Sequence, residues 1–322
     1  MNKNKIKKIV VQASFFLIFQ VIFLAITSPF LAFYGPYENV KQALVGSLME
    51  TGRHQYVAKI FLSDKEINNI IGTKNSKVHS QKADTSKFKI DNKIELLKLD
   101  ANKSFSGYVL LIHNPKRVKV GYSMDFNIPK MNLDTLASRY NAACAINAGG
   151  FSFEKYNMPE GFIFSNGILK YSESKNHNEK EDAMVITKDG QMLVGSYSIN
   201  DLKQLNVSEA VCFGPALVVD GKGVVTKTSF YDIAPRTAIG QKADGTIIML
   251  VTDGRLSASF HFGASLKDIQ DLMLQYGAVT AYNLDGGGST SMYYNGDTLK
   301  FGVNTKFNIT IGRAVPSIIY VK

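Results

Sequence analysis

The chain contains no tryptophan, two cysteines and five histidines in 322 residues. It has no Cys-x-x-Cys pair and no Cys/His cluster, so a zinc site is not indicated. His-Glu-x-x-His, Gly-x-Ser-x-Gly and the P-loop pattern are also missing, which disfavours zinc hydrolases, Ser-His-Asp hydrolases and nucleotide hydrolysis. Carboxylates, arginines, amides and backbone groups remain as the groups that could carry chemistry.

The two cysteines, Cys144 and Cys212, lie in the apolar runs "AACAIN" and "AVCFGPALVV". Such runs predict two buried free thiols. A single disulfide is the alternative, because the chain carries an export signal.

Acidic residues are missing from the first 34 positions, which hold Lys3, Lys5, Lys7 and Lys8. The net charge of the whole chain is +10, and without this segment it is +6. That excess fits an anionic cell-wall polymer, a lipid headgroup or a phosphorylated glycan, and equally a solvated surface. No basic stripe interleaved with aromatic residues occurs, so nucleic acid is not an expected partner.

A long apolar run follows these lysines, from Ile9 to Tyr34. As a helix, its 26 residues would reach roughly 39 Å, enough to cross a hydrocarbon core of about 30 Å. The run has no clear small-residue cleavage site. We therefore expect an uncleaved single-pass anchor in the cell membrane, with the N-terminus inside and the bulk of the chain outside. A cleaved signal peptide is the alternative.

Three regions are expected along the chain: a basic tail and transmembrane anchor (1–34), a helical stalk with a polar linker (35–93), and one domain (94–322). In the stalk, "ENVKQALVGSLMET" and "SDKEINNIIG" read as helices, with Ser63 and Glu66 as a capping box. The lysine-rich stretch 72–93 is typical of a mobile linker.

From Ile94 onward, short β-rich runs alternate with turn signals such as "SNG", "KDG" and "NGD". Two amphipathic segments, "NLDTLASRYNA" and "SLKDIQDLMLQYG", predict helices, the second beginning at Ser265 and ending at Gly277. The fold class expected is α+β, a mixed and largely antiparallel sheet system with a few helices, preceded by a transmembrane helix and a helical stalk.

Four polar clusters interrupt the apolar runs. Asn147 in "AINAGGF" could offer its amide to a ligand close to the backbone, or simply turn the chain. Arg236 in "PRTAIG" and Arg255 in "VTDGR" present the donor fork that matches phosphate or carboxylate, with ion pairing or solvation as alternatives. Asp253 could orient an arginine or act on substrate.

The fourth cluster is "NLDGGGSTSM", in which Asp285 ends an apolar strand. Successive glycine amides can form a nest that binds anions, and hydroxyl residues add donors; a glycine bulge in a tight sheet corner is the alternative. The candidates here are Gly286, Gly287, Gly288, Ser289 and Thr290. Glu160, in "MPEGFIFSNG", is a further carboxylate candidate. Asp253 and Asp285 are candidate Ca²⁺ ligands, although no EF-hand-like spacing supports them.

Five motifs in order, "AINAGGF", "PRTAIG", "LVTDGR", "YNLDGGGSTSM" and "GRAVPSII", resemble the phosphodiester glycosidase family over roughly residues 94–322. That family includes an animal lysosomal enzyme and many bacterial exopolysaccharide biosynthesis proteins. The animal enzyme has a Cys-rich extension and a C-terminal membrane anchor, which this sequence lacks, so its substrate and partners are not carried over.

The resemblance implies cleavage between a sugar anomeric carbon and a phosphodiester. It places Arg313 among the family's recurrent polar positions, together with Asn147, Arg236, Asp253, Asp285 and the glycines that follow. We expect Asp285, Asp253 and Glu160 to act as carboxylates in catalysis. The expected substrate- or phosphate-binding residues are Asn147, Arg236, Arg255, Gly286, Gly287, Gly288, Ser289, Thr290 and Arg313.

Three functions fit this set. The first is an extracellular hydrolase that cleaves a sugar-1-phosphodiester bond in a cell-envelope or exopolysaccharide glycan. The second is a transferase that moves sugar-phosphate units on wall polymer, since water and an acceptor hydroxyl attack alike. The third is an envelope glycan-binding protein without turnover. In each case the expected partners are a glycan or sugar-phosphate polymer and the membrane.

Overall fold

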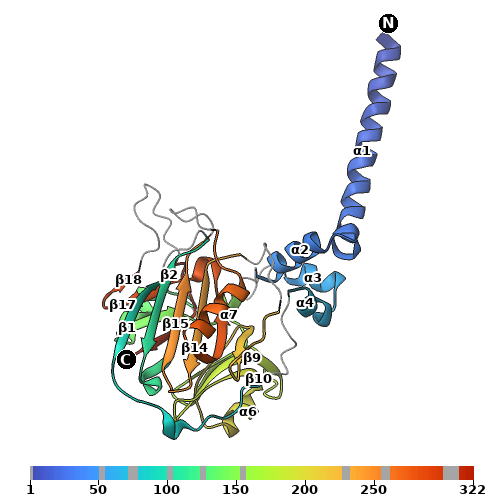
Figure 1. Cartoon of the computed structure of the whole chain (residues 1–322). Helices are drawn as coiled ribbons and strands as arrows, with labels where there is room; N and C mark the ends of the chain where they lie inside the picture. The colour runs from blue at the N-terminus through green and yellow to red at the C-terminus, as the bar shows by residue number, and fades with distance from the viewer. Residues whose placement is uncertain are drawn as a thin grey trace.

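The computed structural model describes residues 3–50, 55–71, 79–99, 104–123, 128–152, 157–226, 233–254, 262–299 and 312–322. A long helix, α1 (Lys3–Tyr34), projects from the rest of the molecule (Figure 1). It is long and apolar enough to cross a membrane, by length and composition, over Val11–Tyr34. This agrees with the apolar run in the sequence.

Three short helices gather at the end of α1: α2 (Glu38–Glu50), α3 (Gln55–Phe61) and α4 (Asp64–Ile71). We refer to them as the α2–α4 unit. The predicted capping box is confirmed, because Glu66 accepts from the Ser63 amide at 2.8 Å and its own amide donates to the Ser63 hydroxyl at 3.3 Å. Helix α3 was not predicted, because its seven residues are too few to show a helical period.

The largest sheet has seven strands in the order β1-β2-β15-β14-β16-β12-β13. Its central strands are hydrophobic on both faces, since the sheet is covered on both sides. The strands are β1 (Ile94–Leu99), β2 (Gly107–Ile112), β15 (Ile247–Thr252), β14 (Arg236–Lys242), β16 (Ala278–Leu284), β12 (Ala216–Val219) and β13 (Lys222–Gly223).

Two five-stranded sheets and a small hairpin complete the β structure. One sheet consists of β10 (Met192–Ser198), β9 (Lys180–Thr187), β11 (Val207–Cys212), β7 (Phe162–Ser165) and β8 (Ile168–Ser172). The other consists of β18 (Asp297–Thr298), β17 (Met292–Tyr294), β4 (Cys144–Asn147), β19 (Ser317–Val321) and β3 (Val118–Tyr122). The hairpin pairs β5 (Phe151–Ser152) with β6 (Met158–Pro159).

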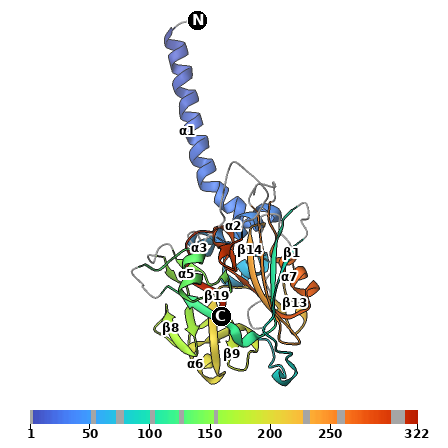
Figure 2. The same cartoon turned by 90° about the vertical axis from the view of Figure 1, so that its left-hand side faces the viewer.

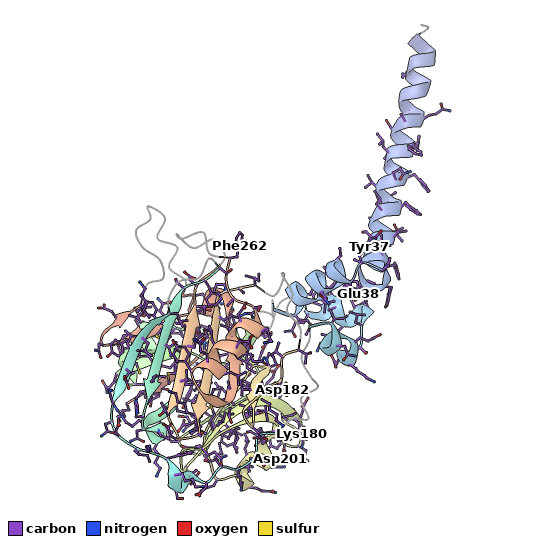
Figure 3. The ribbon with its side chains drawn as sticks, in the orientation of Figure 1. Tyr37, Glu38, Lys180, Asp182, Asp201 and Phe262 are labelled. Carbon is purple, nitrogen blue, oxygen red and sulfur yellow. The ribbon has the colours of Figure 1, made fainter. Side chains whose placement is uncertain are left out.

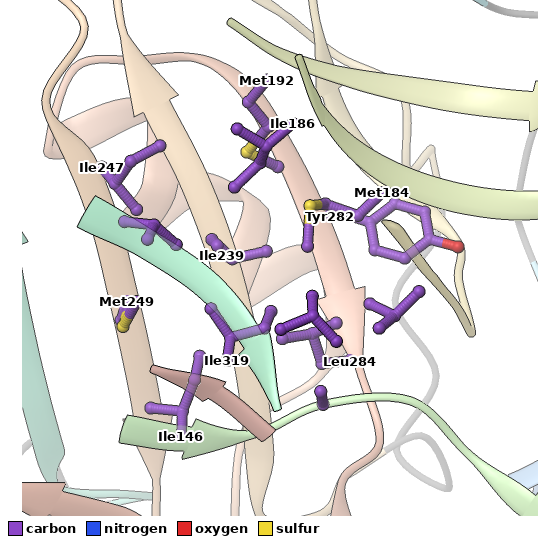
Figure 4. Close-up of a cluster of buried hydrophobic side chains, with 14 of the residues drawn as sticks. Ile146, Met184, Ile186, Met192, Ile239, Ile247, Met249, Tyr282, Leu284 and Ile319 are labelled. Atoms are coloured by element: carbon purple, nitrogen blue, oxygen red, sulfur yellow. The ribbon is translucent and has the colours of Figure 1, made fainter. Parts of the chain in front are cut away.

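The main core lies between the seven-stranded sheet and the two five-stranded sheets. Figure 2 shows the layers, with β14 and α7 on one side and β19, β8 and β9 on the other. Side chains from all three sheets meet in this core, among them Ile146, Met184, Ile239, Tyr282 and Ile319 (Figure 4). The predicted α+β fold with largely antiparallel sheets is confirmed.

Three helices cover the outer faces. Helix α7 (Leu266–Gln275) packs on the seven-stranded sheet, and α5 (Leu133–Arg139) packs on the sheet that contains β4. Both were predicted, and the start of α7 carries a capping box between Ser265 and Asp268. Helix α6 (Ile199–Gln204), six residues long, was not predicted. Short 3-10 helices occur at Thr85–Lys87, Pro115–Arg117 and Gly287–Ser289.

The predicted hairpin turns have the backbone that their residues favour. Asn166 and Gly167 between β7 and β8 have φ of 54° and 78°, and Asn295 and Gly296 between β17 and β18 have φ of 49° and 97°. Two successive positive φ values are the requirement of a type I′ turn, which Asn-Gly meets with little strain. Turn chemistry therefore sets the register of these hairpins.

Residues 79–93 lie along the body and differ from the mobile linker that their composition predicts. The Ser80 amide donates to Val194 O at 3.1 Å, the Lys89 amide donates to Asp244 O at 2.9 Å, and Phe88 lies against Gly245. A hollow of about 170 Å³ beneath this segment is lined by Phe88 and Thr280, among others. It lies at the start of β16, at the opposite end of the strand from Asp285.

A buried carboxylate joins the two five-stranded sheets. Glu209, on β11, accepts from the Val120 amide at 2.9 Å and from the Lys119 ammonium at 3.2 Å, both on β3. Its side chain is fully buried, whereas that of Lys119 is 25% exposed. Charged side chains are rarely buried unless they are paired and hydrogen bonded, and Glu209 meets both conditions.

Replacing Glu209 with alanine should lower the free energy of unfolding by about 3 kcal/mol, because the Lys119 charge and the Val120 amide lose their acceptor. Urea titration of the purified chain would measure this. Glu179→Ala, at an exposed position before β9, is the matched control and should leave the midpoint unchanged. Equal midpoints for both variants would show that Glu209 does not hold the sheets together.

The two cysteines are free and buried. Cys144 belongs to the main core and Cys212 to the cluster between the β9 sheet and α6. Burial raises the pKa of Cys144 to about 12 and raises that of Cys212 strongly. Buried thiols that stay protonated are poor nucleophiles, so the prediction of free structural thiols is confirmed.

Candidate functional site

The candidate residues come from strand ends that meet at one edge of the seven-stranded sheet. Arg236 begins β14 and pairs with Thr252, the last residue of β15; Thr237 pairs with Leu284, the last residue of β16. Because neighbouring strands are antiparallel, the residues after β15 and β16 lie beside the start of β14. Phe262, labelled in Figure 3, marks the same end of the molecule.

Asp285 is the central carboxylate of this edge. It is 7% exposed and directly follows β16. The Arg313 guanidinium lies 3.4 Å from its Oδ2 atom, and the Ser289 hydroxyl and the Gly286 amide also donate to the carboxylate. Burial raises the pKa of Asp285 above the ordinary aspartate value, whereas Arg313 and Ser289 act in the opposite direction. Asp285 is thus a buried acid whose ionised form has partners already in place.

Arg313 is held by several contacts at once. Its Nε donates to the Ser289 hydroxyl at 2.6 Å, and its backbone amide donates to Gly288 O at 2.8 Å. Its guanidinium carbon lies 4.6 Å from the centre of the Phe151 ring, close enough for a cation–π interaction. The side chain is nevertheless 40% exposed, so part of the guanidinium faces solvent. A cation held in this way can stabilise Asp285 and still meet an anion from outside.

A second cation, Lys130, shares the Phe151 ring and was not among the predicted residues. Its Nζ lies 4.1 Å from the centre of the ring. Burial, followed by the nearby Arg313, lowers the pKa of Lys130, while Asp285 raises it. Lys130 therefore lies within electrostatic range of both Asp285 and Arg313. One lysine among many carries no signal in the sequence, although Phe151 does belong to the quoted "AINAGGF" motif.

Asn147 is hydrogen bonded to the segments that carry the site. Its Nδ2 donates to Asp285 O at 2.5 Å, while its Oδ1 accepts from the Thr237 hydroxyl at 2.7 Å and from the Ser291 amide at 3.1 Å. The residue is fully buried. These contacts make Asn147 a positioning residue that ties β4 to β14 and to the backbone of Asp285. Its predicted contact with substrate stays a prediction.

Glu160 lies beside Gly150, the residue before Phe151. Its amide donates to Gly150 O at 3.1 Å, and a Cβ at Gly150 would come within 2.8 Å of the Glu160 carboxylate and 2.9 Å of the Phe213 ring. The close approach explains the glycine before Phe151. The Glu160 carboxylate therefore packs against Gly150 and near Phe213, and its role in catalysis stays a prediction.

The glycine turn uses much of its hydrogen-bonding capacity within the protein. The Gly287 amide donates to Pro235 O at 2.8 Å, the Ser289 amide to Gly286 O, and the Thr290 amide to Gly287 O. Gly287 has φ of +58°, and a Cβ on Gly286 would meet Pro235 O at 2.8 Å. Close packing on β14 and a left-handed turn therefore account for these two glycines. An anion nest built from the three bonded amides is not supported.

Arg236 and Asp253 have contacts that hold the frame of the site. Arg236 is 5% exposed, and its Nε donates to Ala264 O at 3.1 Å, just before α7. Asp253 accepts from the Ser106 amide and from the Ser106 hydroxyl, both at 2.7 Å, and so joins β15 to the start of β2. Their predicted roles toward substrate stay predictions. Arg255 lies outside the described residues.

Two buried polar atoms have no hydrogen-bond partner in the described part of the chain: the Thr290 hydroxyl and the Asn283 Oδ1. Both residues flank Asp285 in the sequence, one at the end of β16 and the other after the glycine turn. Buried polar groups are paired in most proteins, and exceptions gather at functional sites or at sites of bound water. Their position beside Asp285 fits a site that water or a ligand completes.

A metal centre is not evident in the described part of the chain. Among the described residues, no group of three or more His, Cys, Asp or Glu side chains could hold a metal ion. Of the two candidate Ca²⁺ ligands, Asp253 accepts from Ser106 at both oxygens and Asp285 pairs with Arg313. A guanidinium beside a carboxylate repels a further cation. These contacts give no support to a Ca²⁺ site.

The fold is an antiparallel α+β fold, and the site is a buried carboxylate paired with Arg313 at a sheet edge, with Lys130 in electrostatic range. The family profile described as phosphodiester glycosidase matches residues 140–322. The chain belongs to the phosphodiester glycosidase family.

Two individual relatives are similar to parts of the chain. The chain is 31% identical over 169 residues to an uncharacterized protein derived from the SPbeta prophage, YomE of Bacillus subtilis (strain 168); the match covers 50% of this chain and 26% of that protein. It is 36% identical over 64 residues to N-acetylglucosamine-1-phosphodiester alpha-N-acetylglucosaminidase of Bos taurus, covering 20% of this chain and 12% of the enzyme. The matched segments thus span about a quarter or less of these relatives.

Two solved structures share the fold. The zebrafish N-acetylglucosamine-1-phosphodiester alpha-N-acetylglucosaminidase catalytic domain, auto-inhibited by pro-peptide, superposes with a TM-score of 0.58 at 20% identity, covering 76% of this chain and 88% of that one. A hypothetical protein from Synechocystis superposes with a TM-score of 0.50 at 18% identity, covering 71% of this chain and 61% of that one. At these identities the likeness concerns the fold alone.

Proposed function

We propose that the protein is a membrane-anchored hydrolase that cleaves a sugar-1-phosphodiester bond in an extracellular glycan, such as cell-envelope polymer or exopolysaccharide. The observation that carries the proposal is the buried carboxylate of Asp285, held by Arg313 and Ser289, with Lys130 and Arg313 over one aromatic ring. Membership of the phosphodiester glycosidase family supports the reaction class.

The arrangement suits the chemistry of this bond. Ordinary glycosidases need a carboxylic acid to protonate a poor leaving group. A departing phosphate monoester has a second pKa of about 6 and needs less of that help. Cations that neutralise charge as it develops contribute more, and Arg313 and Lys130 provide them. Asp285 supplies the carboxylate that attacks the anomeric carbon or activates water, and Glu160 is the second carboxylate proposed for catalysis.

The direct test is release of free sugar. The full chain in detergent would be incubated with an α-N-acetylglucosamine-1-phosphodiester, and free sugar followed by mass spectrometry. Turnover would support the reaction class. A transferase would release sugar only into an added glycan acceptor, and a glycan-binding protein would bind on a glycan array without turnover. If the folded protein gives neither free sugar nor transfer across a panel of sugar-1-phosphodiesters, the hydrolase proposal fails.

A further inference from the structure

The α2–α4 unit is fastened to the last turns of α1. The Phe61 ring of α3 stacks on Phe33 with centroids 4.4 Å apart and meets Phe30 edge-on at 5.9 Å. The Tyr34 hydroxyl donates to Phe61 O. Phe33 also packs with Val45 of α2 and other apolar side chains of the unit. The end of α3 therefore has a defined position along α1.

That position falls within the apolar span. Phe30 and Phe33 both belong to Val11–Tyr34, the stretch of α1 long and apolar enough to cross a membrane. At 1.5 Å per residue, Phe30 lies about 6 Å from the level of Tyr34 along the helix. Phe61 contacts both Phe30 and Phe33. The end of α3 therefore lies in the same medium as the last turns of the apolar span of α1.

The unit exposes large apolar side chains at this place. On α3, Tyr56 is 57% exposed and Ile60, one turn further on, is 69% exposed. At the start of α2, Tyr37 and Val40 are also exposed, and Figure 3 shows Tyr37 beside the lower end of α1. In the described residues that follow Ile60, exposed large hydrophobic side chains occur only singly, at Ile90, Ile128, Ile168 and Phe262.

We propose that the α2–α4 unit is seated in the outer interface of the bilayer, with Tyr37, Val40, Tyr56 and Ile60 in contact with lipid. The proposal rests on the membrane anchoring proposed above and not on the reaction. Interfacial helices sink about 5–10 Å into the boundary between headgroups and acyl chains, which matches the depth set by Phe61. Tyrosines favour this zone because their rings are apolar and their hydroxyls polar.

Binding of the α2–α4 unit to the bilayer would depend on apolar contact more than on charge. Two pairs of opposite charge in the unit lie close together: Lys59 Nζ is 3.7 Å from Asp64 Oδ1, and Lys41 Nζ is 3.1 Å from Glu38 Oε1. A neutral phosphatidylcholine surface should therefore suffice. The apolar surface of α1 continues directly onto α3, which favours lipid over a protein partner. Such seating would hold the body at a set height above the membrane.

The absence of tryptophan makes the test clean, because one introduced tryptophan is the only indole in the chain. Ile60→Trp and Tyr56→Trp would be placed separately in the full chain, reconstituted in phosphatidylcholine vesicles. Phe23→Trp, in the middle of the span, is the positive control, and Ile168→Trp, exposed on β8, is the negative control. Emission would be compared in vesicles of ordinary lipid and of lipid brominated near the headgroup or near the chain ends.

We expect headgroup-proximal bromine to reduce the emission of Ile60→Trp and Tyr56→Trp about twofold, with blue-shifted spectra. Ile168→Trp should not respond, and Phe23→Trp should respond to the deeper bromine. If only Phe23→Trp is quenched, anchoring stands and the seating proposal is overturned. Blue shift without quenching would indicate a protein contact, such as a second copy, and would also overturn it. If Phe23→Trp is not quenched either, both the membrane anchoring and the interfacial seating of the α2–α4 unit are overturned.

Discussion

Asp285→Asn is expected to reduce sugar release by about a thousandfold while leaving the fold intact. Asparagine has nearly the same shape and can still accept from Ser289 and Arg313, but it cannot attack the anomeric carbon or take a proton from water. The measurement is kcat/KM for release of sugar from the phosphodiester. Asp297→Asn, at the exposed first residue of β18, is the matched control and should keep full activity.

The same substitution should not cost stability at neutral pH. The folded pKa of Asp285 is raised, so the native protein keeps this proton at pH values where the unfolded chain has lost it. Stability therefore falls as pH rises from the ordinary aspartate pKa of about 3.9 through the raised value. Asparagine cannot ionise, so the variant does not carry the cost of a buried charge at this position. The melting temperature of Asp285→Asn should equal or exceed that of the wild type at pH 7. The difference between the two melting temperatures should become smaller at acidic pH.

These two readouts separate the outcomes. Lost activity with an unchanged or higher melting temperature places Asp285 in the chemistry. Lost activity with a large fall in melting temperature would instead make Asp285 a structural residue. Full activity in the variant would remove it from the reaction altogether.

Arg313→Ala should lower kcat/KM by about 100- to 1,000-fold. The guanidinium is expected to meet the phosphate, so its loss should raise KM and lower kcat. It is also the largest influence that lowers the pKa of Asp285, so its removal should raise that pKa further. If ionised Asp285 is required, the acidic limb of the pH–rate profile moves to higher pH. Arg313→Lys should recover activity in part, because it keeps the charge but loses the planar donor fork.

Lys130→Ala is the variant to compare with Arg313→Ala. Lys130 meets the same ring and influences Asp285 through its charge, so its loss should cost about tenfold and mainly raise KM. Arg139→Ala, exposed in the last turn of α5, should leave both constants unchanged. A profile for Arg313→Ala that keeps its acidic limb, with unchanged kcat, would show that Arg313 does not act on Asp285 during turnover.

Much of the fold followed from local rules. The capping residues of α4 and α7 are Ser63 and Ser265, and both form the hydrogen bonds that their spacing predicts. Asn-Gly pairs gave the hairpin turns because few other residues accept two positive φ values. Helices α3 and α6 escaped prediction, since seven and six residues do not establish a period.

The site was predictable where a motif and a burial pattern coincided. Asp285 directly follows an apolar strand, and the structure places it with Arg313, which comes 28 positions later in the chain. Lys130 and Phe151 come from two further segments, and only packing brings them to the same place. A short stretch of sequence indicates backbone preference and polarity. It does not indicate which side chains come into contact between the stacked sheets.

The sequence by itself determined the apolar helix at the N-terminus, the antiparallel α+β class, the free buried thiols and the place of Asp285 directly after an apolar strand. These depend on composition, periodicity and turn chemistry, which act over a few residues. Only the tertiary structure decided that Asn147 and Asp253 bind neighbouring protein groups, that the glycines serve close packing, and that Lys130 joins Arg313 over Phe151. Those outcomes depend on how three sheets stack, because contacts between sheets are set by the shared core and not by neighbours in the chain.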